Sequence, residues 1–418
     1  MEGFNMNWLQ NFSDPSFNAT TSEGLSDEMR TYYSDYLIDN AEPYLVHTQF
    51  GQKHTIPKNG GKTVRFHKYD PLPKIKDALV EGVTPNGQAL KVDTVEATVE
   101  QYGGYVGMTD MLLLTAVDDN LVVATELLGA QAGRSTDTIA REVLAAGTNV
   151  QYGDGTVSAR YLLTGGQASG NDYLTVDAIR RAVRSLKMQN AEKINGSYVA
   201  IIHPDCAYDL MSDPEWKYPH QYQDASNLYE GEIGQIAGVR FVETTEAKIF
   251  HANDLTSKSR TLTVSKFEPA NNTITVKEMF STAEAAALAG RSLVIGGEKF
   301  TVTSAVAFNS LNACTLVLAS SPVSDIPEAG DIIYPGEAGS KARDVYATLI
   351  LGRNAYGVTE IAGGGLEHIV KQLGSSGTSD PLNQRATAGW KCTSAAERLV
   401  EQFMIRVETA STFEAGAN

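Results

Sequence analysis

The stretch "PKNGGKTVRF", residues 57–66, carries a glycine pair followed by Lys62 and Thr63. A phosphate-binding P-loop has the spacing Gly-x-x-x-x-Gly-Lys-Ser/Thr between a strand and a helix, so that backbone N–H groups and the helix N-terminus hold the phosphates. Here Ile56 stands five residues before Gly61, where that motif requires glycine. The residues after the turn alternate apolar and charged side chains, which indicates a strand rather than a helix. We therefore interpret the Asn-Gly pair as a β-turn, because this dipeptide tolerates the positive φ of a hairpin tip.

A long two-stranded ribbon is predicted around this turn. The outward stretch "KTVRFHKY" and the return stretch "LKVDTVEATVEQY" both alternate, and neither face is strongly apolar. The Pro-Asn-Gly of "EGVTPNGQ", residues 81–88, predicts a second turn between them. Because an isolated two-stranded ribbon is marginally stable in water, it needs a surface to lie on, and a neighbouring subunit would supply one.

Charge is distributed unevenly along the chain. The formal net charge is -16, and a chain this acidic repels nucleic acid at long range, which argues against a DNA-reading or DNA-coating protein. Residues 51–76 are the exception, since Asp70 is their only acid. A cationic arm on an anionic body is expected where copies of one chain attract one another head to tail. We predict that its basic residues make assembly contacts between subunits: Lys53, Lys58, Lys62, Arg65, Lys68, Lys74 and Lys76.

Length and composition indicate a globular protein. The chain has 418 residues, of which 42% are hydrophobic, which is enough for two or three domains. No stretch approaches the roughly 20 apolar residues that span a bilayer, and the acidic, polar N-terminus is unlike a secretory signal, so we expect a cytosolic protein. Cys206, Cys314 and Cys392 are far apart and odd in number, which predicts buried thiols rather than disulfides or a metal site.

Two helices are predicted in the first third of the chain. Residues 1–24 have the composition of a flexible arm, and a helix then follows between an N-cap at Ser26 and a stop at Pro43. The strongest helical pattern runs from Asp118 to about Ala146. Gly129 and Gly133 lie inside it, and because glycine weakens a helix, they predict close packing or a bend there.

The remaining sequence predicts a mixed α/β domain that carries an inserted module. "TVDAIRRAVRSLKMQN" has an apolar helical face, "SYVAIIHPDCAYDLMSD" predicts a buried strand leading into a helix, and "EQFMIRVETAST" predicts a closing strand. Between residues 254 and 339, short alternating runs separated by Asn, Gly and Pro turns are typical of a small all-β module. Such an insertion must start and end at adjacent points, so we expect it to project as a knob.

No catalytic, cofactor or metal constellation is evident. His203 and Cys206 are three residues apart, but no second ligand pair accompanies them, which favours a structural histidine. "LGSSG" at 373–377 lacks the spacing of a nucleophile elbow, and "AGGGL" at 362–366 lacks that of a dinucleotide motif. Paired carboxylates carry no information in a chain with 50 acidic residues. We expect no enzymatic activity and no cofactor.

Several stretches together resemble the major capsid protein of tailed bacteriophages, in the family typified by the N-four-like podoviruses. They are "LSDEMRTYYSDYLIDNAEPYLVHTQFGQKHTIPKNGGKTVRF", "EGVTPNGQ", "ATELLGAQAGRSTDTIAREVLAAGTNVQY", "IIHPDCAYDL", "GVRFVETTEA" and "GSSGTSDPLNQRATAGWKC". No single stretch is diagnostic, but their order and number make the resemblance specific.

The resemblance implies an α+β protein with the Hong Kong-type (HK-ninety-seven-like) phage capsid fold, to which this chain adds the β module. It implies the following division: an N-terminal arm and first helix at 1–50; an extended loop, the β-hairpin, at 51–105; a peripheral domain with its spine helix at 106–171; the first part of the axial domain at 172–253; the inserted module at 254–339; the second part of the axial domain at 340–375; and a return to the peripheral domain at 376–418.

The function implied by the resemblance is that of a structural subunit of an icosahedral shell that encloses phage double-stranded DNA without sequence-specific binding. The implied partners are other copies in hexamers and pentamers, a portal protein, and scaffold or decoration proteins, with no membrane. The implied location is the virion capsid, assembled in the bacterial host cytoplasm. Two alternatives stay open on sequence alone: a cellular nanocompartment shell of the encapsulin type, and a cytosolic enzyme whose site is not recognised.

Overall fold

The computed structural model describes residues 37, 41, 44–69, 72, 74–76, 78, 87–115, 120–153, 155–164, 172–216, 234–308, 314–322, 326–371, 373 and 382–413. Some expected features lie outside these residues: the arm at 1–24, the helix start at Ser26, most of the second turn at 81–86, the cap at Asp118 and the serines at 375–376. Leu37 and Ala41, both within the first predicted helix, are helical.

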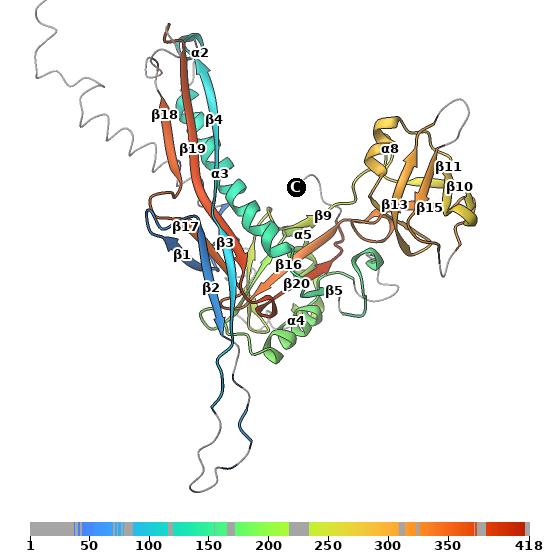
Figure 1. The fold of residues 1–418 in the computed structure, drawn as a ribbon, viewed down its shortest axis with the longest axis horizontal. Coiled ribbons are helices and arrows are strands. Elements are labelled where there is room, and N and C mark those ends of the chain that lie inside the picture. The colour runs from blue at the N-terminus through green and yellow to red at the C-terminus, as the bar shows by residue number, and fades with distance from the viewer. Residues whose placement is uncertain are drawn as a thin grey trace, which may run out of the picture.

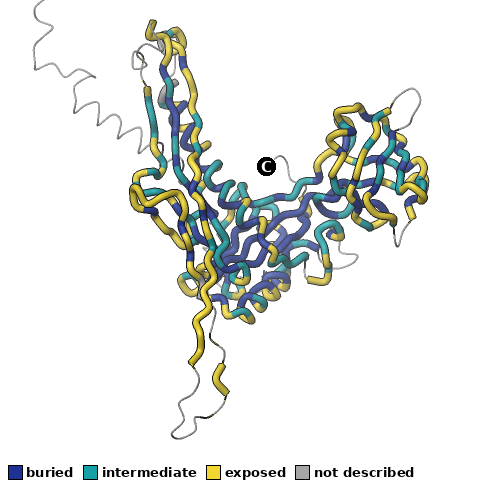
Figure 2. The backbone as a smooth tube through the Cα atoms, in the orientation of Figure 1, coloured by how far each residue is buried: buried dark blue, intermediate teal, exposed yellow. Residues whose placement is uncertain are grey.

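The chain forms a tall pillar, a central body and a separate barrel, and a two-stranded ribbon leaves the foot of the pillar (Figure 1). The pillar and the barrel stand on opposite sides of the body, and the ribbon extends in the direction opposite to the top of the pillar. Buried residues follow the pillar and the body, whereas the far part of the ribbon is exposed wherever it is described (Figure 2). The ribbon therefore projects beyond the folded body.

The pillar is built on a five-stranded sheet whose centre is the long strand β19. Its elements are β1 (Gln52–Ile56), β4 (Glu100–Thr109), β17 (Tyr356–Ile361), β18 (Glu367–Lys371), β19 (Arg385–Arg398), and the helices α2 (Asp110–Thr115) and α3 (Asn120–Ala145). β4 and β18 pair antiparallel with the same part of β19, so they lie on its two sides, and β17 pairs with its last residues. β1 adds parallel to β17.

α3 is the predicted long helix, 26 residues in length, or about 40 Å at the usual helical rise. Leu128 and Ala132 of this helix are buried against Trp390 and Cys392 of β19. At Gly133 an added Cβ would overlap with the carbonyl oxygen of Ala41. The close packing predicted from the helical glycines is therefore confirmed at Gly133.

The body is a seven-stranded sheet covered by two helices. Its elements are β5 (Val150–Tyr152), α4 (Val176–Met188), β6 (Tyr198–Ile202), α5 (Pro204–Ser212), β7 (Gln235–Ile236), β8 (Val239–Glu243), β9 (Ile249–Phe250), β16 (Val345–Leu351) and β20 (Met404–Thr409). The order is β5-β20-β16-β6-β8-β7, and β9 also pairs with β16. α4 begins after Thr175, whose side chain accepts a hydrogen bond from Ala178 N–H, and it buries Ile179, Val183 and Leu186 against the strands.

The barrel is closed and has a core of its own. Its elements are β10 (Leu262–Glu268), β11 (Thr273–Val276), α8 (Thr282–Leu288), β12 (Ser292–Ile295), β13 (Glu298–Val306), β14 (Thr315–Leu318) and β15 (Ile332–Pro335). A capping box between Ser281 and Glu284 starts α8. The chain leaves the body after Phe250 and returns at Val345, and these two residues are paired across β9 and β16. The barrel therefore starts and ends at one point of the body sheet. Short 3-10 turns also occur: Arg160–Leu162, Pro269–Asn271, Ser340–Ala342 and Glu401–Phe403.

A buried ionic cluster joins the body to the end of α3. Glu408 of β20 is fully buried, accepts two hydrogen bonds from the Arg160 guanidinium at 2.6 and 2.7 Å, and accepts one from Arg406 Nε at 2.7 Å. Arg406 Nη1 in turn donates to the carbonyl oxygens of Ala145 and Gly147, just where α3 ends. A cation at this position also interacts favourably with the C-terminal end of the helix dipole.

The sheets divide the last third of the chain differently from the expected domains. Residues 340–375 were expected in the axial domain, yet β17 and β18 belong to the pillar sheet. Residues 376–418 were expected in the peripheral domain, yet only β19 joins the pillar, and β20 lies inside the body sheet. The reason for β20 is physical: Arg406 and Glu408 neutralise each other, so a strand whose sequence suggests one polar face is buried on both faces.

Candidate assembly interface

The 57–62 loop is a turn that opens a strand. Gly60 N–H donates to the Pro57 carbonyl at 2.9 Å, and Asn59 has a φ of 66°. β2 (Thr63–Tyr69) follows at once and pairs antiparallel with β3 (Val92–Thr98). The interpretation of this stretch as a turn is confirmed, because a strand stands where a P-loop would need a helix.

The root of the ribbon is packed on its own body. Val64 and Phe66 of β2 and Ala97 of β3 are buried together with Ala395 of β19. Gly357 makes room for this contact, since an added Cβ would lie 2.8 Å from the Phe66 ring. The expectation that neither ribbon face is strongly apolar is wrong at the root. The apolar face is divided between two strands, so each strand alone shows a weak pattern.

Beyond the root the ribbon keeps apolar side chains in solvent. Leu72, Ile75, Leu90 and Val92 are all exposed, and Ile75 retains 78% of its accessible surface. Exposed apolar side chains that gather on one projecting segment are typical of an interaction surface. This part of the ribbon has chemistry suited to a contact with another molecule.

The seven predicted contact residues are spread over β1 of the pillar, the turn and the ribbon rather than gathered at one point. Lys53 lies on β1, Lys58 and Lys62 lie in the turn, and Arg65 and Lys68 lie on β2. Lys74 and Lys76 follow β2 in the projecting part. All except Lys68, whose side chain is not described, are exposed.

Some of this charge is engaged within the same chain, which the sequence reasoning missed. Arg65 Nε lies 2.6 Å from Glu96 Oε1, directly across the ribbon, and Lys91 lies 3.7 Å from Asp93. The return strand supplies acids that residues 51–76 lack, so residues 51–105 hold eight basic and six acidic residues. The pairing of the two ribbon strands is the signal that could have found this ion pair, because it places Glu96 opposite Arg65. An exposed ion pair contributes only about 0 to 1 kcal/mol, so Arg65 can exchange its partner at little cost.

A buried hydrogen-bonded group fixes the segment that leads into the ribbon. His47 donates its backbone N–H to Asp137 Oδ1 at 2.6 Å, and its imidazole Nδ1 lies 2.6 Å from Oδ2. Tyr356 of β17 donates its hydroxyl to the carbonyl oxygen of His47, and burial raises the pKa of that hydroxyl above its ordinary value. Three segments of the pillar thus meet at His47. The ribbon departs from a rigid base.

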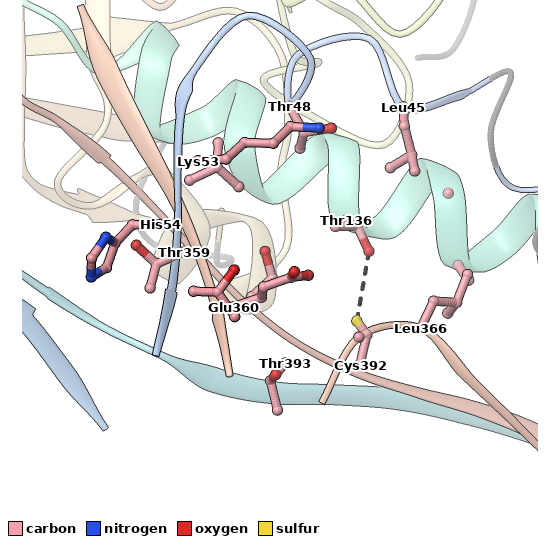
Figure 3. A pocket seen from close by; sticks show the side chains of 16 residues that line it. Leu45, Thr48, Lys53, His54, Thr136, Thr359, Glu360, Leu366, Cys392 and Thr393 are labelled. Atoms are coloured by element: carbon pink, nitrogen blue, oxygen red, sulfur yellow. Dashed lines mark hydrogen bonds between the residues drawn. The ribbon is translucent and has the colours of Figure 1, made fainter. Parts of the chain in front are cut away.

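A pocket lies beside this base, between α3 and strands β1, β17 and β19 (Figure 3). Its volume is about 240 Å³, and Lys53, Glu360 and Thr393 are among the residues that line it. Thr136 Oγ1 and Cys392 Sγ lie 3.7 Å apart on its wall, and burial raises the pKa of the Cys392 thiol. A thiol held in its protonated form is a weak nucleophile, so the pocket lacks an activated group at this residue.

The other candidate residues have structural partners. His203 Nδ1 accepts a hydrogen bond from Asp205 N–H at 3.2 Å and caps α5, as a structural histidine would. Cys206, Cys314 and Cys392 are free and buried, as predicted. Within the part of the chain that the structure describes, no group of three His, Cys, Asp or Glu side chains is arranged to hold a metal ion. The described helices include none with the length and apolarity needed to cross a membrane.

Comparison with known sequences assigns the chain to a family. Residues 55–315, more than half of the chain, match the family described as phage capsid protein. The chain belongs to the phage capsid protein family. Among curated proteins, none matches this capsid protein.

Solved structures agree with this capsid protein in fold. The capsid structure of the cyanophage P-SCSP1u is similar with a TM-score of 0.50 and 12% identity, over 87% of each chain. The capsid of Ralstonia phage GP4 is similar with a TM-score of 0.50 and 15% identity, over 88% of this chain and 89% of that one. The expected Hong Kong-type capsid fold is confirmed. The protein is a structural subunit of a phage capsid shell.

Proposed function

We propose that this capsid protein is the major shell subunit of an N-four-like podovirus, and that its ribbon grips the acidic flank of a neighbouring copy. The observation that carries this proposal is the projecting ribbon. Its root is buried on its own body, but Leu72, Ile75 and Leu90 are exposed beyond it, among Lys74 and Lys76. Several weak contacts of this kind, repeated through a closed shell, order assembly while each single contact stays reversible.

The proposal assigns parts of the chain to capsid domains. The pillar with α3 corresponds to the peripheral domain, the body sheet with α4 and α5 to the axial domain, and the ribbon to the extended loop. The sheet membership supports a division in which β17, β18 and β19 belong to the pillar and β16 and β20 to the body. Residues 1–50 are proposed as the N-terminal arm, and the barrel as a decoration of the shell.

The net charge supports an enclosed genome rather than a coated one. At -16, the subunit presents more acid than base, and a lining that repels phosphate lets packaged double-stranded DNA move without adhering. The proposed assembly takes place in the bacterial cytoplasm, with copies in hexamers and pentamers, a portal protein at one vertex, and scaffold or decoration proteins as further partners.

Sedimentation of the purified chain tests the proposal, with negative-stain images of the fastest fraction. We expect closed particles at low ionic strength and fewer of them as salt rises, because salt screens exposed charges. A chain that stays monomeric at every concentration and salt level would refute the assembly function. Particles that recruit an enzyme rather than a genome during expression would favour a nanocompartment instead.

A further inference from the structure

Two segments join the barrel to the body, residues 251–261 and residues 336–344, and together they are called the neck below. Figure 1 shows the barrel standing apart from the body sheet at the end of this neck. Segments without regular strands are where hinge motions occur, because a few of their residues can absorb a large change in backbone angles. The angle between barrel and body therefore depends on side chains that bind across the neck.

The two neck segments are joined to each other next to the body. Asp344 is buried, accepts a hydrogen bond from Ala252 N–H at 2.9 Å, and places its Oδ2 3.1 Å from His251 Nδ1. Ala252, Ala338 and Ala342 form a small buried cluster between the segments. These contacts hold the two segments together, but all of them lie within the neck, so they leave the orientation of the barrel open.

Arg291 of the barrel, which lies between α8 and β12, binds both segments of the neck. Its Nε donates to Glu337 Oε1 at 2.8 Å, on the segment that returns to the body. Its Nη1 and Nη2 donate to the carbonyl oxygens of Asp254 and Asn253 at 2.7 and 2.9 Å, on the segment that leaves the body. Because a guanidinium is planar and its N–H donors point in fixed directions, bonds to two separate segments define an orientation. A single side chain thus sets the barrel against the neck.

Glu337 continues this contact into the body. Its carbonyl oxygen accepts a hydrogen bond from Arg160 Nη1 at 3.2 Å, and the same guanidinium binds Glu408 of β20. Arg160 Cζ also lies 3.3 Å from the ring centroid of Phe250, the residue after which the chain leaves the body sheet. Glu408 binds Arg406, whose guanidinium holds the last carbonyl groups of α3. A connected set of hydrogen bonds therefore runs from the barrel to the end of α3.

We propose that Arg291 and Glu337 form a latch that holds the barrel at one angle to the body, and that Arg160 and Glu408 connect this latch to the end of α3. With the latch closed, the barrel, the body sheet and the end of α3 move as one unit. With the latch open, the barrel turns on the neck while the body and α3 keep their places. This inference goes beyond the proposed function, because it concerns a single subunit and needs no neighbouring copy.

The distance between two spin labels on the full chain tests the latch. The native cysteines are buried, so labels attach to two introduced cysteines, Leu127→Cys on α3 and Thr301→Cys on β13, at positions that are both exposed. Labelled chain is diluted in unlabelled chain, so that double electron–electron resonance reports only the distance within one subunit. We expect a single narrow distance distribution from this labelled chain, because a closed latch permits one angle.

Variants of the latch should broaden this distribution. Arg291→Ala removes all three bonds to the neck and should abolish the single narrow peak. Arg291→Lys keeps the charge but lacks the planar fork of donors, so its distribution should also broaden. Glu337→Ala should broaden the distribution less, since Arg291 keeps its two carbonyl partners. Lys266→Ala, which removes an exposed ion pair with Glu268 inside the barrel, is the matched control and should leave the width unchanged.

An unchanged width in Arg291→Ala would overturn the latch, and so would a broad distribution from the labelled chain without further changes. If thermal unfolding shows that the barrel of Arg291→Ala does not fold, Glu337→Ala decides, because Glu337 lies outside the barrel strands. Arg160→Ala tests the connection to α3: its distribution should broaden, and an unchanged width would refute that connection. None of these results depends on particle formation, so failure of the latch is distinguishable from failure of the proposed function.

Discussion

The carboxylate of Asp137 on α3 binds both the backbone N–H and the imidazole of His47, and both side chains are fully buried. Ninety residues of sequence separate the two, so this contact closes a long loop that contains the whole ribbon. The helix α3 therefore sets the direction in which the ribbon leaves the pillar. A ribbon that must meet a neighbour at a defined angle needs such an anchor.

Removal of this anchor should weaken the fold. Asp137→Ala leaves the His47 N–H and imidazole buried without their acceptor, which should lower the free energy of unfolding by about 2 to 4 kcal/mol. Tyr356→Phe removes only the hydroxyl bond to the His47 carbonyl and should cost about 1 kcal/mol. Urea denaturation followed by circular dichroism measures both. Equal effects of the two variants would contradict the assigned role of Asp137.

Changes at the joint between α3 and the body should lower the free energy of unfolding further still. Glu408→Gln leaves the buried guanidinium of Arg406 and the partly exposed guanidinium of Arg160 without a counter-charge, and breaking a buried ion pair typically costs about 3 to 5 kcal/mol. The same change in the exposed Arg180–Glu215 pair, Glu215→Gln, is the matched control and should cost less than about 1 kcal/mol. If Glu408→Gln lowers the free energy of unfolding no more than Glu215→Gln does, the ionic cluster does not hold the joint.

Alanine at position 133 should destabilise the protein, although alanine in place of glycine usually stabilises a helix. Gly→Ala inside a helix normally stabilises by about 1 kcal/mol. At Gly133 the new methyl group would overlap with the Ala41 carbonyl and press on Tyr44, and overpacking of this kind costs about 1 to 3 kcal/mol. We therefore expect Gly133→Ala to lower the melting temperature. A rise in the melting temperature of Gly133→Ala would mean that the chain at Ala41 does not pack against α3 at position 133.

The sequence predicts the local elements well and their grouping less well. The turn at Asn59, the ribbon strands and the long helix follow from local rules, because each is decided by neighbours in sequence. The burial of Phe66 against Gly357 and the placement of β20 depend on residues far apart in the chain. Charge reasoning over one strand likewise found Arg65 but missed Glu96, which only strand pairing brings opposite. Long-range pairing is what a single sequence does not display.

The barrel should be separable from the rest of the subunit. Because Phe250 and Val345 are paired in the body sheet, a short Gly-Ser linker in place of residues 254–339 spans the gap without strain. The barrel also has its own buried core, from Leu255 to Ile333. We expect the excised chain to be soluble and to unfold in one cooperative transition. If the excised chain is recovered only as aggregate, the claim that the barrel folds independently of the body is wrong.

The structure changes how the ribbon charge must be tested. Replacing Arg65 by Glu places two carboxylates opposite each other across the ribbon, because Arg65 faces Glu96. A loss of assembly in the variant Lys58→Glu, Lys62→Glu, Arg65→Glu could then come from a weakened ribbon. Adding Glu96→Arg to this variant restores the internal pair while the turn stays acidic, so it separates the two causes. The barrel variant Lys258→Glu, Lys266→Glu, Lys277→Glu changes the net charge of the subunit equally and serves as the control.

The most direct measurement is the sedimentation profile of these three proteins and the unmodified chain at low ionic strength. The account predicts particles from the unmodified chain and from the barrel variant, and folded but unassembled subunits from both ribbon variants, with or without Glu96→Arg. Particles of normal size from the triple ribbon variant would contradict the claim that the cationic ribbon grips the neighbouring subunit.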